Sequence, residues 1–383
     1  MTGPTHGHES GVGNMNLQFW QVLIVYFCAF AVTMLLVPVS IKIAEKTGGM
    51  DVPTDNRRVH THPIPRLGGM AIFLGTMAAI LFALAFHWLA GGKAPISPMK
   101  MVGVMIGGCL IWLEGTIDDY KNLKPAVKLI AQVGCASVVA AFGDSIQVLH
   151  NYFGTGAFDL ANATSFILTV IWIVAITNTI NLVDGVDGLA AGLVAIGSLC
   201  IAYVAYIFGY YPGCLCLMAV AGGALGFLPY NFYPAKTFMG DGGSQFLGFM
   251  VAALSILQPV KSTTIVALLI PALVLALPIF DTLFAIIRRK INGQPIMKAD
   301  KGHIHHRLMR AGFGQRRTVL ILYGMAGVMG VAAVLFSRGL YVECCGLGAV
   351  AFLFLIIVLT DRNKIRPELK DPTIVIHKED ENK

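Results

Sequence analysis

Charged residues are scarce in this chain of 383 residues: Asp, Glu, Lys and Arg together make up 13%. A soluble globular protein carries about 25%. Because 56% of the residues are hydrophobic, the composition excludes a water-soluble globule and also a disordered chain. The eight cysteines follow no metal-site or disulfide spacing, so we expect them to behave as small buried hydrophobic residues.

The few charges separate long apolar runs, which is typical of a polytopic membrane protein. A helix of about 20 apolar residues spans the roughly 30 Å hydrocarbon core of a bilayer. We therefore predict an all-α integral membrane protein with about eleven transmembrane helices and a cytoplasmic-face active site. One catalytic domain, 17–361, would lie between polar tails at 1–16 and 362–383. The candidate spans are 17–40, 69–90, 100–117, 126–143, 164–181, 188–208, 213–230, 243–258, 264–288, 318–337 and 340–360.

Lys and Arg are distributed unevenly between the two sets of loops. The segments 41–68, 115–128, 231–242, 288–317 and 361–383 hold 24 of the 28 basic residues. Since cytoplasmic loops carry the excess of Lys and Arg, we predict a multi-pass protein of the cell inner (cytoplasmic) membrane, with its N-terminus outside and its C-terminus cytoplasmic. The net charge of +7 then reflects contact with anionic membrane lipids, and no nucleic acid is expected as a partner.

Acidic and His-rich clusters all fall on the predicted cytoplasmic side, which indicates one composite site built from several helix ends. Asp118 and Asp119 close the third run. Adjacent carboxylates repel each other unless a cation joins them, so the pair suggests a hard metal such as Mg²⁺. The alternative is a solvated acidic helix terminus.

A second cluster lies between the fifth and sixth runs. Asn181, Asp184 and Asp187 recur at every third position, and Gly185 and Gly188 stand among them. The glycines predict a broken or unwound junction, which membrane proteins tolerate only where it lines protein or a watery cavity. Because acids at this depth are costly, we favour a functional site over a simple polar turn.

Two further segments suit phosphate groups. The glycine-rich segment 240–244 precedes a predicted helix, whose N-terminus would favour an anion, although an empty turn is the alternative. The loop 288–317 contains His303, His305, His306 and Arg307, which could grip a diphosphate. Positive-inside charge alone explains its Lys and Arg but not its His. Asp281, in the ninth run, is either a further buried acid of the site or a packing partner.

Together these features indicate phosphoryl transfer with one substrate in the bilayer. The segments DNRRVHTHPIPRLGG, GTIDDYKNL, NTINLVDGVDGLAAG, FMGDGGSQFLGF and GHIHHRL resemble the polyprenyl-phosphate N-acetylhexosamine-1-phosphate transferase family. They are most similar to its UDP-GlcNAc:undecaprenyl-phosphate branch, because the phospho-MurNAc-pentapeptide branch typically has three consecutive His residues in the last motif. One departure is His62, where family members often carry Lys.

The resemblance implies transfer of GlcNAc-1-phosphate from UDP-GlcNAc to undecaprenyl phosphate, with release of UMP, as the initiating step of a surface polysaccharide. It also implies the roles of particular residues. Mg²⁺, or Mn²⁺ in its place, would bind Asp241 and Asp119. The catalytic residues would be Asp118, Asp119, Asp184 and Asp187, and the substrate-binding residues His60, Asn181, His303, His305, His306 and Arg307.

Other functions stay open at this point. The same family could act on another UDP-N-acetylhexosamine or on a phospho-MurNAc-pentapeptide donor. A cation- or proton-coupled transporter would also hold buried acids, but transporters place them near the bilayer midplane, whereas here they lie at the ends of the runs. The sequence does not distinguish a monomer from a homodimer, and it does not identify the polymer.

Overall fold

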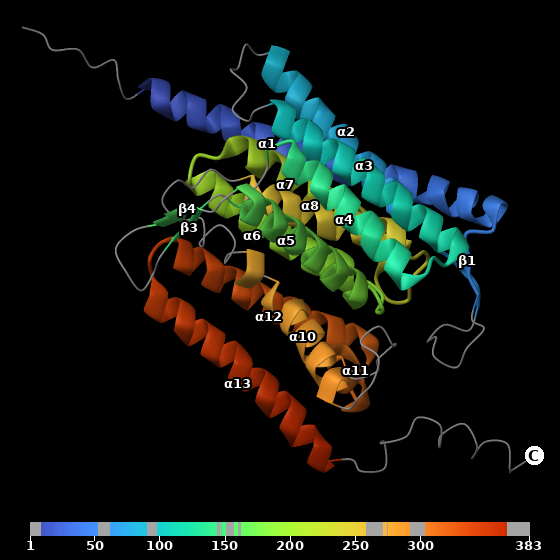
Figure 1. Cartoon of the computed structure of the whole chain (residues 1–383). Coiled ribbons are helices and arrows are strands. Elements are labelled where there is room, and N and C mark those ends of the chain that lie inside the picture. Colours follow the sequence, from blue (N-terminus) through green and yellow to red (C-terminus); the bar gives the residue numbers. More distant parts are fainter. Residues whose placement is uncertain are drawn as a thin grey trace, which may run out of the picture.

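Helices make up almost all of the structure, a computed structural model that describes residues 9–52, 62–89, 98–143, 146, 148–150, 157–159, 162–257, 271–273, 275–291 and 303–365 (Figure 1). The helices are α1 Glu9–Thr47, α2 Gly68–Leu89, α3 Pro98–Lys121, α4 Pro125–Ala141, α5 Asn162–Val183, α6 Leu189–Ile207, α7 Tyr211–Asn231, α8 Gly240–Ile256, α10 Ala276–Ile291, α11 Ile304–Arg310, α12 Gln315–Ser337 and α13 Tyr341–Ile365. Two antiparallel strand pairs join them, β1 Met50–Asp51 with β2 Ile64–Pro65 and β3 Val148–His150 with β4 Ala157–Asp159.

Seven helices of the described part of the chain are long and apolar enough to cross a membrane: α1, α2, α3, α5, α6, α7 and α12. Helix α4 and the first part of α13 are shorter apolar helices. Most of the predicted runs therefore form the expected helices, and the protein is polytopic and all-helical. The first residues of the ninth run lie outside the described residues. Helix α1 begins at Glu9, inside the predicted N-terminal tail.

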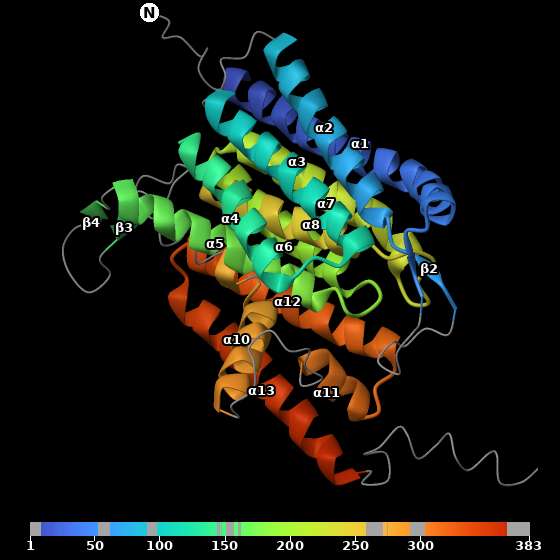
Figure 2. The ribbon, with the colours of Figure 1, turned by 45° about the vertical axis from the view of Figure 1, so that its right-hand side comes forward.

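Helix α8 is the centre of the bundle and packs against α3, α5 and α2 (Figures 1 and 2). Nearly all of its residues are buried, including Phe246 and Phe249. A helix that is apolar on every side belongs in the interior, where other helices cover it completely. The N-terminal end of α8 is therefore surrounded by other helices, and this arrangement positions the site described below.

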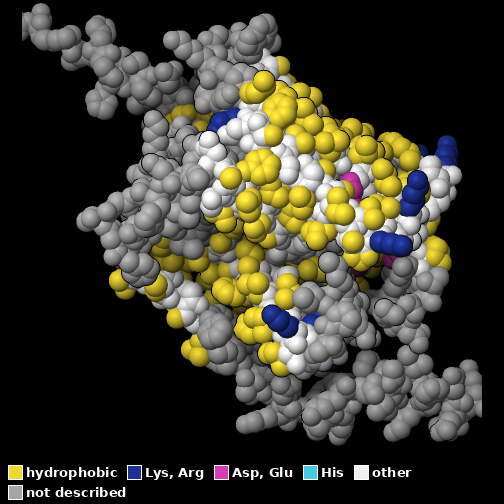
Figure 3. All heavy atoms as spheres, viewed as in Figure 1, with side chains coloured by type: hydrophobic (Ala, Val, Ile, Leu, Met, Phe, Trp, Pro, Cys, Tyr) yellow, Lys and Arg dark blue, Asp and Glu magenta, His cyan; other side chains and the backbone are white. Residues whose placement is uncertain are grey.

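The outer surface of the bundle is apolar as well. Large hydrophobic side chains such as Leu35 and Ile130 are more than 70% exposed. Figure 3 shows hydrophobic side chains across the visible face, with several Lys and Arg side chains gathered at the end where β1 is labelled in Figure 1. In water such a surface would cause aggregation, whereas lipid tails cover it without cost, as a polytopic membrane protein requires.

Hydrogen bonds hold β2 against the segment that leads into α8. The amide of Phe238 donates to the carbonyl of Pro65 at 2.7 Å, and the hydroxyl of Thr237 donates to the same carbonyl at 2.9 Å. The amide of Gly69 in turn donates to the carbonyl of Met239 at 2.9 Å. These bonds place the start of α2 beside the start of α8.

Small residues let α1 and α7 approach closely. A Cβ atom added to Gly222 would lie 2.3 Å from the carbonyl oxygen of Tyr26, and one on Gly226 would lie 2.4 Å from that of Phe30. Both obstacles are backbone atoms of α1, which cannot move as a side chain can. Close helix contact through glycine is a common packing mode in membranes.

We expect Gly222→Ala to lower the stability of the protein by about 1–3 kcal/mol, because the added methyl group forces α1 away from α7. The measurement is the thermal midpoint in detergent, followed by fluorescence-detected size exclusion. Gly327→Ala on α12 is the matched control, because a Cβ there meets no atom within 4 Å. Equal midpoints for the two variants would contradict the close contact.

Candidate active site at the helix ends

Asp119, at the end of α3, is the anion that covers the N-terminus of α8. Its Oδ1 accepts a hydrogen bond from the amide of Asp241 at 2.8 Å, and its Oδ2 accepts one from the amide of Gly242 at 3.1 Å. Free amides at a helix N-terminus attract negative charge. The sequence analysis expected a phosphate there, but in the structure a carboxylate of the chain itself already takes two of these amides.

Arg66, in the segment between β2 and α2, forms an ion pair with Asp119. Its guanidinium lies 2.8 Å from the Oδ1 of Asp119 in an ion pair in which the carboxylate is almost fully buried. Burial alone would lower the pKa of Arg66, but the charges of Asp119 and Asp241 raise it above its usual value. Arg66 is therefore a permanent cation at the N-terminal end of α8.

Gly240 makes the close contact between these elements possible. Its φ of +68° lies in the left-handed region that favours glycine. A Cβ on this residue would also lie 2.4 Å from the Oδ2 of Asp119 and 2.5 Å from the carbonyl oxygen of Arg66. Any other residue here would separate Asp119 from the helix that it caps.

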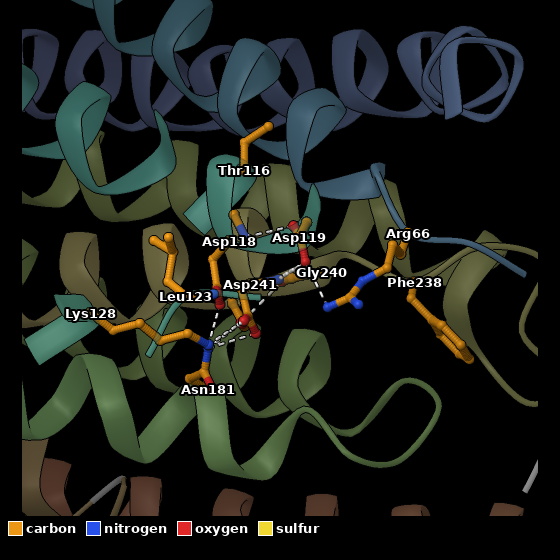
Figure 4. A network of polar contacts seen from close by, with 12 residues as sticks. Arg66, Thr116, Asp118, Asp119, Leu123, Lys128, Asn181, Phe238, Gly240 and Asp241 are labelled. Carbon is orange, nitrogen blue, oxygen red and sulfur yellow. Dashed lines mark hydrogen bonds and ion pairs between the residues drawn. The ribbon is translucent and has the colours of Figure 1, made fainter. Parts of the chain in front are cut away.

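Lys128 joins the other member of the acidic pair to Asp241 (Figure 4). Its ammonium group forms ion pairs with Asp118 and with Asp241, the latter at 2.8 Å. The second oxygen of Asp118 accepts from the amide of Leu123 at 2.6 Å. The two members of the acidic pair therefore have separate cations, Lys128 for Asp118 and Arg66 for Asp119, rather than one cation between them.

Asn181, on α5, also contacts Asp241. Its side-chain amide donates to the Oδ1 of Asp241 at 3.1 Å and to the hydroxyl of Ser244 at 3.2 Å. Side chains from α3, α4, α5 and α8 therefore converge on Asp241 (Figure 4). This convergence agrees with the expectation that distant acidic clusters meet at one end of the bundle.

A cavity of about 680 Å³ opens beside this network, within the range usual for small-molecule sites. Of the predicted site residues, Asn181, Asp184, Asp187, Asp241 and His306 line it. Arg66, His62, Tyr233 and Phe238 line it as well. Asp118 and Asp119 do not line it; Asp118 is linked to Asp241 through Lys128, and Asp119 through the backbone amide of Asp241.

Asp184 and Asp187 lie in the junction between α5 and α6, which is non-helical from 184 to 188, as the glycines predicted. Burial raises the pKa of Asp184 well above its usual value, and the nearby carboxylates of Asp241 and Asp119 raise it further. Asp187 accepts a hydrogen bond from the amide of Ala235 at 3.0 Å. Both carboxylates therefore lie at the cavity, and Asp187 also holds the segment that contains Ala235.

The His-rich segment divides into two parts. His303 pairs with Asp281 of α10 at 3.0 Å, and the amide of Ile304 donates to the other oxygen of Asp281 at 2.9 Å. Asp281 is therefore the packing partner that the sequence analysis left as one alternative. His305 is buried beside His303, and burial together with the charge of His306 lowers the pKa of His305 to about 3.

Only some of this segment therefore faces the cavity. His306 lines it, while His303 and His305 point into the packing between α10 and α11. Arg307 is exposed on α11. His60, the remaining predicted substrate contact, lies outside the described residues.

Sequence reasoning missed Arg66 and Lys128 as members of the site. Both were counted only as positive-inside charges, because a basic residue near a predicted cytoplasmic loop needs no other explanation. It also missed a buried amide chain in which Asn178 donates to Gln132 at 2.5 Å and Gln132 donates to Gln245 at 2.9 Å. Polar residues inside otherwise apolar runs were the available signal.

Comparison with known proteins identifies the family. Residues 101–258 match the model of Glycosyl transferase family 4. A probable undecaprenyl-phosphate N-acetylglucosaminyl 1-phosphate transferase of Bacillus subtilis is 39% identical over 83% of this chain and 85% of the relative. A decaprenyl-phosphate N-acetylglucosaminephosphotransferase of Mycobacterium tuberculosis is 37% identical over 86% and 84%. A phospho-N-acetylmuramoyl-pentapeptide-transferase of Desulforudis audaxviator is 31% identical over 83% and 99%.

The matched family segment begins within α3 and ends just after α8, so it contains Asp118, Lys128, Asn181 and Asp241. The relatives cover more than four fifths of the chain. We conclude that this multi-pass membrane protein belongs to glycosyl transferase family 4 and is one of its phosphoglycosyl transferases.

Proposed function

We propose that this enzyme transfers GlcNAc-1-phosphate from UDP-GlcNAc to undecaprenyl phosphate, releasing UMP and forming undecaprenyl-diphospho-GlcNAc. The observation that carries the proposal is the cavity at the start of α8, beside which carboxylates from α3, α8 and the α5–α6 junction lie with two half-buried cations. The two relatives named for a GlcNAc transferase activity are more similar to this chain than the pentapeptide transferase is. We therefore favour UDP-GlcNAc over a phospho-MurNAc-pentapeptide donor.

The chemistry asks little of the protein beyond positioning and charge neutralisation. One phosphoanhydride replaces another, and the attacking lipid phosphate is already ionised at neutral pH. Catalysis then depends on holding two anions in line and balancing their charge. Lys128 and Arg66 supply positive charge beside the cavity, and we assign Asp118 to orienting the lipid phosphate through Lys128.

The donor set fits Mg²⁺, which would neutralise the diphosphate when bound. The acids near the start of α8 outnumber the cations Arg66 and Lys128, and a divalent ion would favour the charged form of the Asp184 carboxyl, whose pKa burial raises. Among the described residues no three His, Cys, Asp or Glu side chains already form a metal cluster. Asp241 and Asp184 line the cavity, so we assign the ion to these two.

Asp119 has a different role in this proposal from the metal ligand that the sequence analysis expected. Both of its oxygens accept hydrogen bonds from α8 amides, and one also pairs with Arg66. A carboxylate bound in this way has little capacity left for a metal. We therefore propose that Asp119 fixes the start of α8 and so positions Asp241.

The orientation is also part of the proposal. The helix ends that carry the site adjoin the loops with most Lys and Arg, which the positive-inside rule places in the cytoplasm. In this proposal the water-soluble UDP-GlcNAc enters the cavity from the cytoplasm, and the lipid phosphate enters it from the bilayer. The count of eleven spans and the homodimer stay predictions.

The activity is tested with purified protein, radiolabelled UDP-GlcNAc, undecaprenyl phosphate and Mg²⁺. We expect a labelled lipid product and an equal amount of UMP, with loss of both when EDTA is added. Competition with unlabelled UDP-GalNAc and with UDP-MurNAc-pentapeptide identifies the donor. Stronger competition by either of these than by unlabelled UDP-GlcNAc would contradict the assigned sugar.

Asp241→Asn is expected to lower the rate of UMP release by about 100-fold or more, because it removes a charge that holds the metal and the diphosphate together. Raising the Mg²⁺ concentration should restore part of that rate. The control is Glu45→Gln, an exposed carboxylate near the end of α1, which should behave as the unchanged enzyme. Near-normal turnover by a folded Asp241→Asn variant would remove this residue from the site.

The two neighbouring histidines should differ in their kinetics. His306→Gln is expected to raise the KM for UDP-GlcNAc about tenfold, as loss of one hydrogen bond to a charged group does. His305→Gln should leave KM unchanged, because the pKa of His305 is lowered to about 3 and the ring stays neutral and buried at every practical assay pH. A larger KM effect from His305→Gln than from His306→Gln would reverse this assignment.

A further inference from the structure

Glu114 is a buried acid that the proposed reaction does not use. It lies on α3 one helical turn before Asp118 and is 9% exposed. Neither oxygen of its carboxylate has a hydrogen-bond partner among the described residues. A buried carboxylate without a partner is costly, and more so inside a membrane. Such a group is expected to have a partner in another state of the protein.

The charges around Glu114 identify that partner. The ammonium of Lys128 and the carboxylates of Asp118 and Asp241 all lie within electrostatic range of it. Residues four apart on a helix lie on one face, about 5–6 Å from each other, so Glu114 and Asp118 present two carboxylates to the same lysine. Lys128 has four rotatable side-chain bonds and is anchored on α4, which packs directly against α3.

A second unpartnered group lies beside Glu114. The side-chain nitrogen of Gln245 on α8 is buried and has no acceptor within the described part of the structure, while the oxygen of the same amide accepts from Gln132. Gln245 lies close enough to Glu114 for its side-chain amide to favour the charged form of the carboxylate, although the two groups form no hydrogen bond of good geometry. The amide of Gln245 is therefore the one uncharged group that the carboxylate of Glu114 addresses in this arrangement, and it does so without a well-formed hydrogen bond.

The present position of Lys128 conflicts with a metal at Asp241. Its ammonium occupies one oxygen of Asp241 at 2.8 Å, and a divalent cation at the same carboxylate would repel it. At such a short distance the repulsion between like charges is strong in a medium of intermediate dielectric constant. Lys128 must then move, and the move must not leave its charge unpaired in the protein interior.

We propose that Glu114 is the second acceptor for Lys128: the ammonium withdraws from Asp241 to Glu114, keeping Asp118, when a divalent cation binds with the nucleotide sugar. Glu114 is then a positioning residue that acts through Lys128 and touches no substrate. The inference rests on the proposed function, because it requires a cation at Asp241. This role would account for an acid on α3 one helical turn before Asp118.

The test is a double-mutant cycle on Mn²⁺ binding to the full-length protein in detergent, measured by electron paramagnetic resonance without substrate. We expect Glu114→Gln to weaken Mn²⁺ binding about tenfold, because Lys128 then competes for Asp241. Lys128→Met should bind Mn²⁺ more tightly than the unchanged protein. In the Lys128→Met background, Glu114→Gln should change the dissociation constant less than twofold.

Two outcomes would overturn the proposal. Equal weakening by Glu114→Gln with and without Lys128 would mean that Glu114 attracts the metal directly. Unchanged Mn²⁺ affinity in Glu114→Gln would mean that it does not accept Lys128. If Asp241→Asn leaves Mn²⁺ binding intact, the metal site of the proposed function is wrong, and the inference fails with it. If Asp241→Asn abolishes Mn²⁺ binding while Glu114→Gln does not change it, only the role of Glu114 is wrong.

Thermal unfolding without metal distinguishes positioning from a purely structural role. Because the Glu114 carboxylate lacks a partner in the metal-free state, Glu114→Gln should keep or raise the thermal midpoint, and the exposed Glu45→Gln control should leave it unchanged. A fall of several degrees in Glu114→Gln alone would show that Glu114 already holds the metal-free fold together, and it would contradict the proposal.

Discussion

The bond between the carboxylate of Asp119 and the amides of the first turn of α8 determines how the rest of the site is arranged. It joins the end of α3 to the start of the most buried helix, and Arg66 adds the start of α2 to the same point. The backbone groups at a helix terminus must find partners when they are buried. Here the partner is an acid of the neighbouring helix, which holds Asp241 at the edge of the cavity and directs it toward Lys128 and Asn181.

The bilayer explains why the polar groups gather at one end. Inside the hydrocarbon, acids and amides are tolerated only where they pair with one another, and the described structure meets this condition with Lys128, Arg66 and the chain Asn178–Gln132–Gln245. The carboxylate of Glu114 lacks a well-formed hydrogen bond, and in the proposed mechanism it is a second acceptor for Lys128. The proposed binding of a cation and two anions would change the charge balance of the site at each step, and a second acceptor would keep Lys128 paired throughout.

Much of the architecture was predictable, because a bilayer demands apolar helices of a certain length, and their runs are visible in the sequence. The unwound junction at 184–188 was predictable from its glycines for a similar reason. The acidic pair was harder. Successive residues of a helix point about 100° apart, so Asp118 faces Lys128 while Asp119 faces α8 and Arg66. The sequence showed two equivalent acids, and their separate partners came from helices 10 and 122 residues away.

The sequence by itself determined the membrane class, the family resemblance and the acidic clusters, because composition, run length and motif order are local properties of the chain. Only the tertiary structure decided which oxygens already have donors, which histidine faces the cavity and which acid stays unpaired. His303 and His306 belong to one short motif, yet the first packs against Asp281 and the second lines the cavity. The physical reason is that hydrogen bonding and burial depend on neighbours from other helices, and no local pattern in the sequence specifies those neighbours.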